Sequence, residues 1–161
     1  MDTREKILSR GGLHDVLEEH RHSGRRIVFA SGVFDLLHAG HVRYLAAARA
    51  EGDLLVVGIH SDASARALKG GGRPILTERA RAALVAALSA VDYVVIFDDA
   101  DVKPLLREFH PDVHAIGAGE ARDPAREKEL ETLLGVRAAL VGDAKAHSTR
   151  DIVERVRRSH P

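Results

Sequence analysis

Short apolar runs alternate with helix-like segments along most of the chain, and this alternation constrains the fold more than any other feature. Runs rich in Val, Ile, Leu and Ala predict strands at 26–31, 54–59, 93–97, 112–116 and 136–141. Helical spacing predicts helices at 39–50, 77–88, 101–109, 124–134 and 148–158. Strands separated by helices indicate parallel strands joined by right-handed crossovers. We therefore predict one α/β domain, a doubly wound five-stranded parallel sheet in a three-layer α/β/α sandwich.

The first residues precede this alternation. Residues 3–21 show helical spacing broken at Gly11-Gly12, so we predict a helical lead-in over 1–23 and a main domain over 24–161. In Rossmann-like sheets, ligands bind beyond the carboxyl ends of the strands, where the strand order reverses. The residues that follow Ser31, Ile59, Ile116 and Val141 should therefore rim one crevice.

Composition excludes several classes of protein. The 161 residues suffice for one self-sufficient core, and 24 basic against 24 acidic side chains give no field favouring nucleic acid or an anionic membrane. There are no cysteines, hence no disulfide framework, thiolate zinc cluster or cysteine nucleophile. No zinc-binding His spacing appears, no apolar run could span a bilayer, and the charged N-terminus has no apolar signal core. We expect a soluble cytoplasmic protein.

The chemistry-bearing residues gather at the first strand–helix junction, over 31–41. The spacing matches neither a dinucleotide-binding glycine fingerprint nor a Walker loop. His38 and His41 flank Gly40 at the predicted mouth of a helix, where free backbone N–H groups favour anions. Imidazoles three residues apart share one side of the turn and can donate hydrogen bonds to phosphate oxygens. This arrangement predicts a polyphosphate cradle, whereas the alternative is a chance meeting of two histidines at a helix cap.

At these residues the chain resembles the nucleotidyltransferases with an H-x-G-H signature. The resemblance rests on SGVFDLLHAGHVRYL (31–45) and continues through GDLLVVGIHSD (52–62), LKGGGRPI (68–75), ALSAVDYVV (87–95) and HSTRDI (147–152). Among subfamilies it looks most like the adenylyltransferases that act on D-glycero-β-D-manno-heptose 1-phosphate, with glycerol-3-phosphate cytidylyltransferase as the nearest other relative. These enzymes transfer a nucleoside monophosphate to a phosphorylated acceptor and release pyrophosphate.

The resemblance implies a set of site residues. It implies that Mg²⁺ is bound mainly through the nucleotide phosphates, and that ATP or CTP and a phosphorylated sugar or polyol are the ligands. Asp35 and Asp62 are candidates for acceptor or metal contact, although each also fits a local turn or cap. The implied catalytic residues are His38, His41 and Lys69. The implied nucleotide- or phosphate-binding residues are Gly32, Val33, Phe34, Gly40, Arg81, Gly117, Ser148 and Thr149.

The chain also departs from the family pattern. Ile116 stands where the heptose enzymes usually carry a lysine, with Arg122 or His114 as candidate substitutes, and Arg150 stands where a second threonine is common. These departures leave the acceptor open. The resemblance favours an adenylyltransferase, with a cytidylyltransferase or a catalytically silent nucleotide-binding module as alternatives. A homodimer is the default assembly for such a protein.

Overall fold

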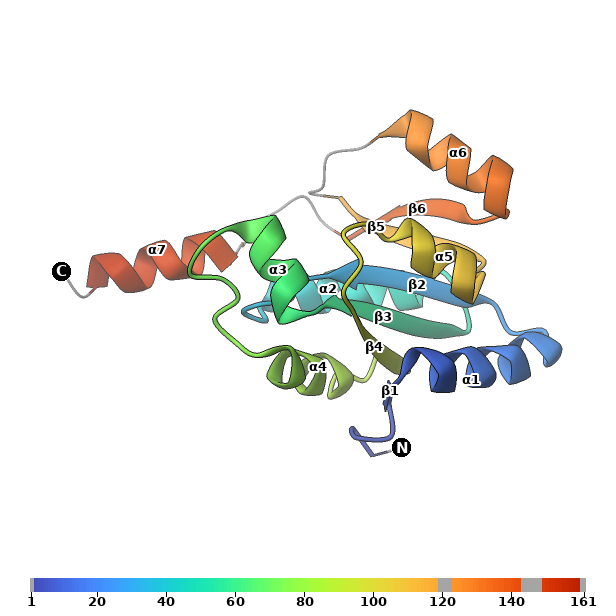
Figure 1. Cartoon of the computed structure of the whole chain (residues 1–161), viewed down its shortest axis with the longest axis horizontal. Coiled ribbons are helices and arrows are strands. Elements are labelled where there is room, and N and C mark those ends of the chain that lie inside the picture. The colour runs from blue at the N-terminus through green and yellow to red at the C-terminus, as the bar shows by residue number, and fades with distance from the viewer. Residues whose placement is uncertain (1, 119–122, 143–148, 160–161) are drawn as a thin grey trace.

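A six-stranded, all-parallel sheet forms the centre of the computed structural model, which describes residues 2–118, 123–142 and 149–159 (Figure 1). Its strand order is β1-β4-β3-β2-β5-β6. The strands are β1 (Ile7–Leu8), β2 (Ile27–Gly32), β3 (Leu54–His60), β4 (Tyr93–Phe97), β5 (Val113–Gly117) and β6 (Arg137–Val141). The helices are α1 (Arg10–His22), α2 (Ala39–Arg49), α3 (Asp62–Lys69), α4 (Glu78–Ala86), α5 (Lys103–Phe109), α6 (Pro124–Leu134) and α7 (Thr149–Ser159).

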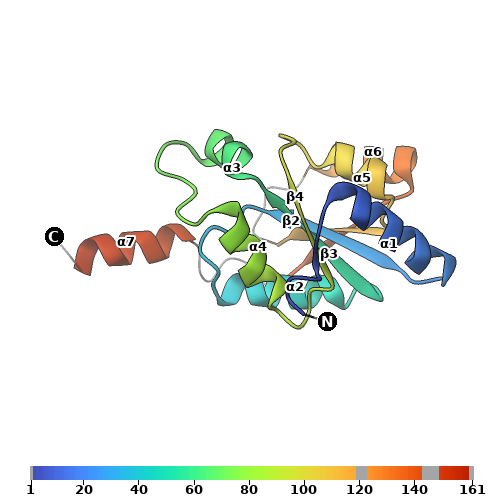
Figure 2. The same cartoon turned by 60° about the horizontal axis from the view of Figure 1, so that its bottom comes forward.

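Apolar side chains cover both faces of this sheet and create the three layers. The central strand β3 is buried from Leu54 to Ile59, as expected for a parallel strand between two helix layers. In Figure 2, α1, α5 and α6 lie on one side of the sheet, and α2 and α4 lie on the other. The α1, α5 and α6 layer packs through Leu13, Leu17, Leu105, Phe109 and Leu130. The α2 and α4 layer packs through Leu45, Ala48, Ala82 and Val85.

The helix boundaries follow local capping chemistry. Thr77 caps α4 as predicted, because its hydroxyl accepts a hydrogen bond from the Ala80 N–H. Pro104 lies in the first turn of α5, where its missing N–H costs nothing. Gly135 follows α6 with a φ of 68°, a left-handed conformation that ends helices and suits glycine. The predicted sandwich is thus confirmed, with nearly the predicted element bounds.

The structure corrects the prediction for the N-terminus. Residues 10–22 form one continuous helix that begins at the Ser9 cap and runs through Gly11-Gly12, so the lead-in is not broken there. Ile7–Leu8 adds a sixth strand by pairing with β4, which makes the sheet one strand larger than predicted. A two-residue strand has no alternation to detect, and helix α1 is held by packing its buried Leu13 and Leu17. The first residues therefore belong to the same sheet and core as the rest.

The last helix takes a different position from the others. In both views α7 projects away from the body of the sheet (Figures 1 and 2). Among the described residues, no helix is long and apolar enough to cross a membrane.

Candidate active site

The order of the strands places the candidate site between the carboxyl ends of β2 and β5. The chain moves from β2 through β3 to β4 on one side, then crosses to β5 and β6 on the other. The switch in direction therefore falls between β2 and β5, where doubly wound sheets open a crevice. Helix α2 follows β2, and the neighbouring strand β5 ends at Gly117. The sequence predicted that the residues following Ser31 and Ile116 would lie at this edge of the sheet.

The turn from β2 into α2 contains a non-glycine residue in the left-handed conformation. Phe34 is buried and has a φ of 51°, a left-handed conformation that a non-glycine residue adopts only when its surroundings hold it there. Its ring lies over Gly32, where an added Cβ would sit 2.9 Å from Phe34 Cε2. Gly32 is thus required for close packing, and Phe34 also contacts the His41 ring at a centroid distance of 5.2 Å.

His38 and His41 meet at the mouth of α2. His38 is the N-cap residue and His41 is the third residue of the helix, with Gly40 between them in the first turn. Their rings are stacked, with centroids 3.8 Å apart and an interplanar angle of 23°. The sequence prediction that they share one side of the turn is confirmed. Two imidazoles therefore stand beside the free N–H groups of a helix N-terminus, which attract anions.

Their surroundings keep His41 neutral. Burial, and then the nearby charge of His38, lower the pKa of His41 to about 4. The His38 backbone N–H points to His41 Nδ1 at 3.4 Å, which makes Nδ1 the acceptor and leaves the proton on Nε2. At neutral pH, His41 is therefore a hydrogen-bond donor through Nε2 and carries no charge of its own.

Asp35 is tied to the glycine-rich segment that follows α3. Its Oδ2 accepts a hydrogen bond from Arg73 Nη1 at 2.7 Å, and its Oδ1 accepts from the Ile75 and Leu76 N–H groups at 2.7 and 3.1 Å. Burial alone would raise the pKa of Asp35, but the bonds from Leu76, Arg73 and Ile75 outweigh it and lower the pKa. Asp35 thus links the β2–α2 turn to the residues before α4, one of the two roles that the sequence allowed, and its acceptor or metal contact stays a prediction.

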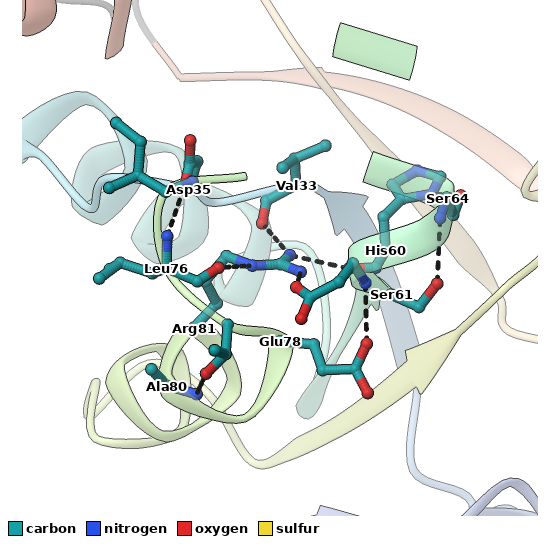
Figure 3. Close-up of polar contacts among 12 residues, drawn as sticks. Val33, Asp35, His60, Ser61, Ser64, Leu76, Glu78, Ala80 and Arg81 are labelled. Atoms are coloured by element: carbon teal, nitrogen blue, oxygen red, sulfur yellow. Dashed lines mark hydrogen bonds and ion pairs between the residues drawn. The ribbon is translucent and has the colours of Figure 1, made fainter. Parts of the chain in front are cut away.

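Arg81 is also bound by the protein itself. Its side chain is 0% exposed and donates to the carbonyl oxygens of Leu76, Val33 and His60 and to Asp62 Oδ1, at 2.7 to 3.0 Å (Figure 3). The phosphate-binding role that the resemblance implies for Arg81 does not fit this buried guanidinium. Asp62 is the partner of Arg81 and the first residue of α3, whose cap is Ser61.

Lys69 and His60 lie near this cluster. Lys69 is the last residue of α3, a helix that the sequence analysis did not predict. Burial lowers the pKa of His60, and the positive charges of Arg81 and Lys69 lower it further. His60 Nδ1 lies 2.8 Å from Ser64 Oγ, which donates to the Asp99 carbonyl. Sequence reasoning gave His60 no role, although its place directly after a buried strand was a signal.

Some predicted residues cannot be placed. Ser148 and Arg122 lie outside the described residues, and Thr149 is described only as the first backbone position of α7. In the described ranges, no group of three or more His, Asp or Glu side chains is arranged to hold a metal ion. Within the described ranges, the two candidate metal contacts, Asp35 and Asp62, are each paired with an arginine.

Comparisons with known proteins show what this chain is similar to. The family model described as Cytidylyltransferase-like matches residues 29–155. "Bifunctional protein HldE" of Syntrophotalea carbinolica is 45% identical over 94% of this chain and 31% of that protein. The protein of the same name from Rhodopseudomonas palustris is 45% identical, with the same coverage of each chain. The chain thus spans less than a third of the length of these relatives.

A solved structure supports the same comparison. It is the lipopolysaccharide core biosynthesis protein from Thermoplasma volcanium, with a TM-score of 0.68 and 32% sequence identity. The match covers 76% of this chain and 100% of that one. The similarity therefore extends to the arrangement of the sheet and its helices.

Proposed function

Since the chain belongs to the cytidylyltransferase-like family, we propose that it transfers a nucleoside monophosphate to a sugar phosphate and releases pyrophosphate. The proposed donor is ATP and the proposed acceptor is heptose 1-phosphate, in keeping with the sequence resemblance and with the HldE relatives. The observation that carries the proposal is the stacked His38–His41 pair at the mouth of α2, the helix that follows β2 at the switch point between β2 and β5.

The chemistry needs positioning more than proton transfer. An oxygen of the acceptor phosphate attacks the α-phosphorus, the bond from that phosphorus to the bridging oxygen breaks, and pyrophosphate leaves with the electron pair. The acceptor is already an anion, so no general base is required. His41 donates through Nε2 while His38 and the α2 N–H groups add donors, and together they stabilise the charge that develops on the leaving group. Mg²⁺ bound to the phosphates supplies further charge neutralisation.

The residue at position 116 favours two alternative functions. Ile116 is a partly buried apolar residue near the end of β5, where the heptose enzymes usually carry a lysine. This favours either a different acceptor, such as glycerol 3-phosphate with CTP as donor, or a silent nucleotide-binding module. A homodimer remains a proposal for the assembly.

A pyrophosphate-release assay separates these functions. ATP, CTP, GTP and UTP are each paired with heptose 1-phosphate, other sugar phosphates and glycerol 3-phosphate. We expect release with ATP and heptose 1-phosphate, whereas CTP with glycerol 3-phosphate indicates the cytidylyltransferase. Nucleotide binding without release from any pair indicates the silent module.

The histidine pair is tested with variants. His38→Ala or His41→Ala should each lower kcat by about 10²–10³, the usual cost of losing one donor to a developing oxyanion. His22→Ala, at the exposed end of α1, is the matched control. Near-normal turnover in both site variants would reject the role given to the pair.

A further inference from the structure

Arg81 joins segments that are distant in sequence. From α4 its guanidinium reaches the β2–α2 turn at Val33, the end of β3 at His60, the start of α3 at Asp62 and the loop before α4 at Leu76 (Figure 3). Only a planar fork of five N–H donors can serve four acceptors in different directions. Because its side chain is fully buried, the guanidinium of Arg81 is not accessible to a phosphate in this structure.

The contacts at Asp62 and Leu76 close the segment 62–76 at its base. Arg81 holds the first residue through Asp62 Oδ1 at 2.8 Å and the last through the Leu76 carbonyl at 3.0 Å. Glu78 adds a second hold on the first residue by accepting from the Asp62 N–H at 2.8 Å. Asp35 accepts from the Leu76 N–H, so the peptide groups on either side of Leu76 are both bound.

Between these ends, the segment is also held where Ser64 binds the Asp99 carbonyl and where Arg73 and Ile75 bind Asp35. Its glycine stretch has no such contacts: Gly70 and Gly72 have φ values of 87° and 80°, and an added Cβ on either, or on Gly71, would meet no atom within 4 Å. Leu68, directly before Lys69, is half exposed. The course of the chain around Lys69 therefore depends on these anchoring contacts more than on packing of the glycines themselves.

Lys69 lies within the closed segment, directly before the three glycines. The positive charge of Lys69 is one of the causes that lower the pKa of His60. The carbonyl oxygen of His60 is in turn one of the four acceptors of Arg81. The same guanidinium thus binds the end of β3 and both ends of the segment that carries the ammonium group.

We propose that Arg81 is a positioning residue: by closing the segment 62–76 at its base, it orients Lys69, to which the proposed function gives a phosphate-binding role, without itself touching substrate. This inference rests on the proposed transferase function and gives Arg81 a role other than phosphate binding. It predicts that Arg81 acts on turnover through Lys69, and that nucleotide affinity does not depend on the guanidinium.

A double-mutant cycle tests the link to Lys69. Arg81→Lys keeps the charge but loses the fork, and should lower kcat/KM for the acceptor by at least about tenfold. In a Lys69→Ala background the same change should cost less than about threefold, because the group it positions is gone. Arg79→Lys, an exposed arginine on the same helix, is the matched control and should change neither value. If the reduction of kcat/KM in the double variant equals the product of the two single-variant reductions, the proposal is overturned.

Two readouts independent of turnover complete the test. Amide hydrogen exchange over 62–76 should accelerate by at least about tenfold in Arg81→Lys and stay unchanged in Arg79→Lys. Affinity for an ATP analogue with a methylene between the α- and β-phosphorus should stay within about threefold of wild type. Unchanged exchange, or analogue binding lost in step with activity, would contradict the proposal. If the wild type released no pyrophosphate with any substrate pair, the proposed function would fail, while exchange would still decide whether Arg81 fixes the segment.

A second pair of variants covers the case in which Arg81→Lys does not fold. Asp62 is about one-third exposed, and Asp62→Ala removes only one of the four acceptors of Arg81. Asp62→Asn keeps an oxygen in that place. Asp62→Ala should reproduce the faster exchange over 62–76, and Asp62→Asn should recover at least about half of that change on a logarithmic scale. Equal exchange in wild type and Asp62→Ala would contradict the proposal.

Discussion

Replacing His41 with glutamine should change how stability depends on pH. The folded-state pKa of His41 is about 4, against 6.5 for a free histidine, because the side chain is buried beside His38. Between these two values the unfolded chain binds more protons than the folded one, so the free energy of unfolding rises as pH rises. One group with this difference contributes up to about 3 kcal/mol, less where solvent screens a partly exposed ring.

Glutamine suits the test because it occupies the same place in the capping arrangement. At the third position of a helix its side-chain oxygen can accept from the N-cap N–H, as His41 Nδ1 does from His38, but it does not titrate. Urea unfolding, followed by circular dichroism from about pH 4 to about pH 7, gives the free energies. The wild-type curve should rise more steeply than the His41→Gln curve across this window. His22→Gln controls for loss of a histidine. Parallel curves for wild type and His41→Gln would refute the argument that burial keeps His41 neutral.

Two further substitutions test the links around the site. Asp35→Asn keeps an oxygen toward the Ile75 and Leu76 N–H groups but loses the ionic bond from Arg73, which should cost about 1.5–3 kcal/mol at neutral pH. Because the folded-state pKa of Asp35 is below 3.8, that penalty should shrink as pH falls below 3.8, and a constant penalty in urea unfolding would count against the ion pair. Gly58→Ala would place a Cβ 2.8 Å from Phe29 Cζ and should cost about 1–3 kcal/mol. A thermal midpoint equal to wild type would show that the ring moves aside freely.

The sequence predicted those parts of the fold that have a strong local pattern. The sequence predicted almost the observed bounds of the buried strands at 54–59 and 93–97 and of the Thr77 cap. Hydrophobic periodicity and capping depend on residues that are neighbours in the sequence, so they can be recognised without the tertiary fold. Strand β1 and helix α3 were not predicted, because neither has a strong local pattern. The first is two residues held by pairing with β4, and the second is a short helix that begins at its Ser61 cap and ends at a run of glycines.

The site divides in the same way. His38 and His41 could be paired from their spacing on one turn, and the structure stacks them. The partners of Asp35 and Arg81 could not be read from the chain, because Arg73, Leu76 and Val33 come together only through the tertiary fold. Arginine side chains are mostly exposed, so residue type alone predicts that Arg81 is solvated. Its burial becomes visible only when the β2–α2 turn and the end of β3 are placed against it.

A crystal structure of the protein with the methylene-bridged ATP analogue would test the central claim most directly. The account predicts phosphate oxygens within about 2.7–3.2 Å of an imidazole nitrogen of both His38 and His41, at the mouth of α2. It would be contradicted by a triphosphate bound elsewhere on the chain, with both imidazoles beyond hydrogen-bond reach of every phosphate oxygen.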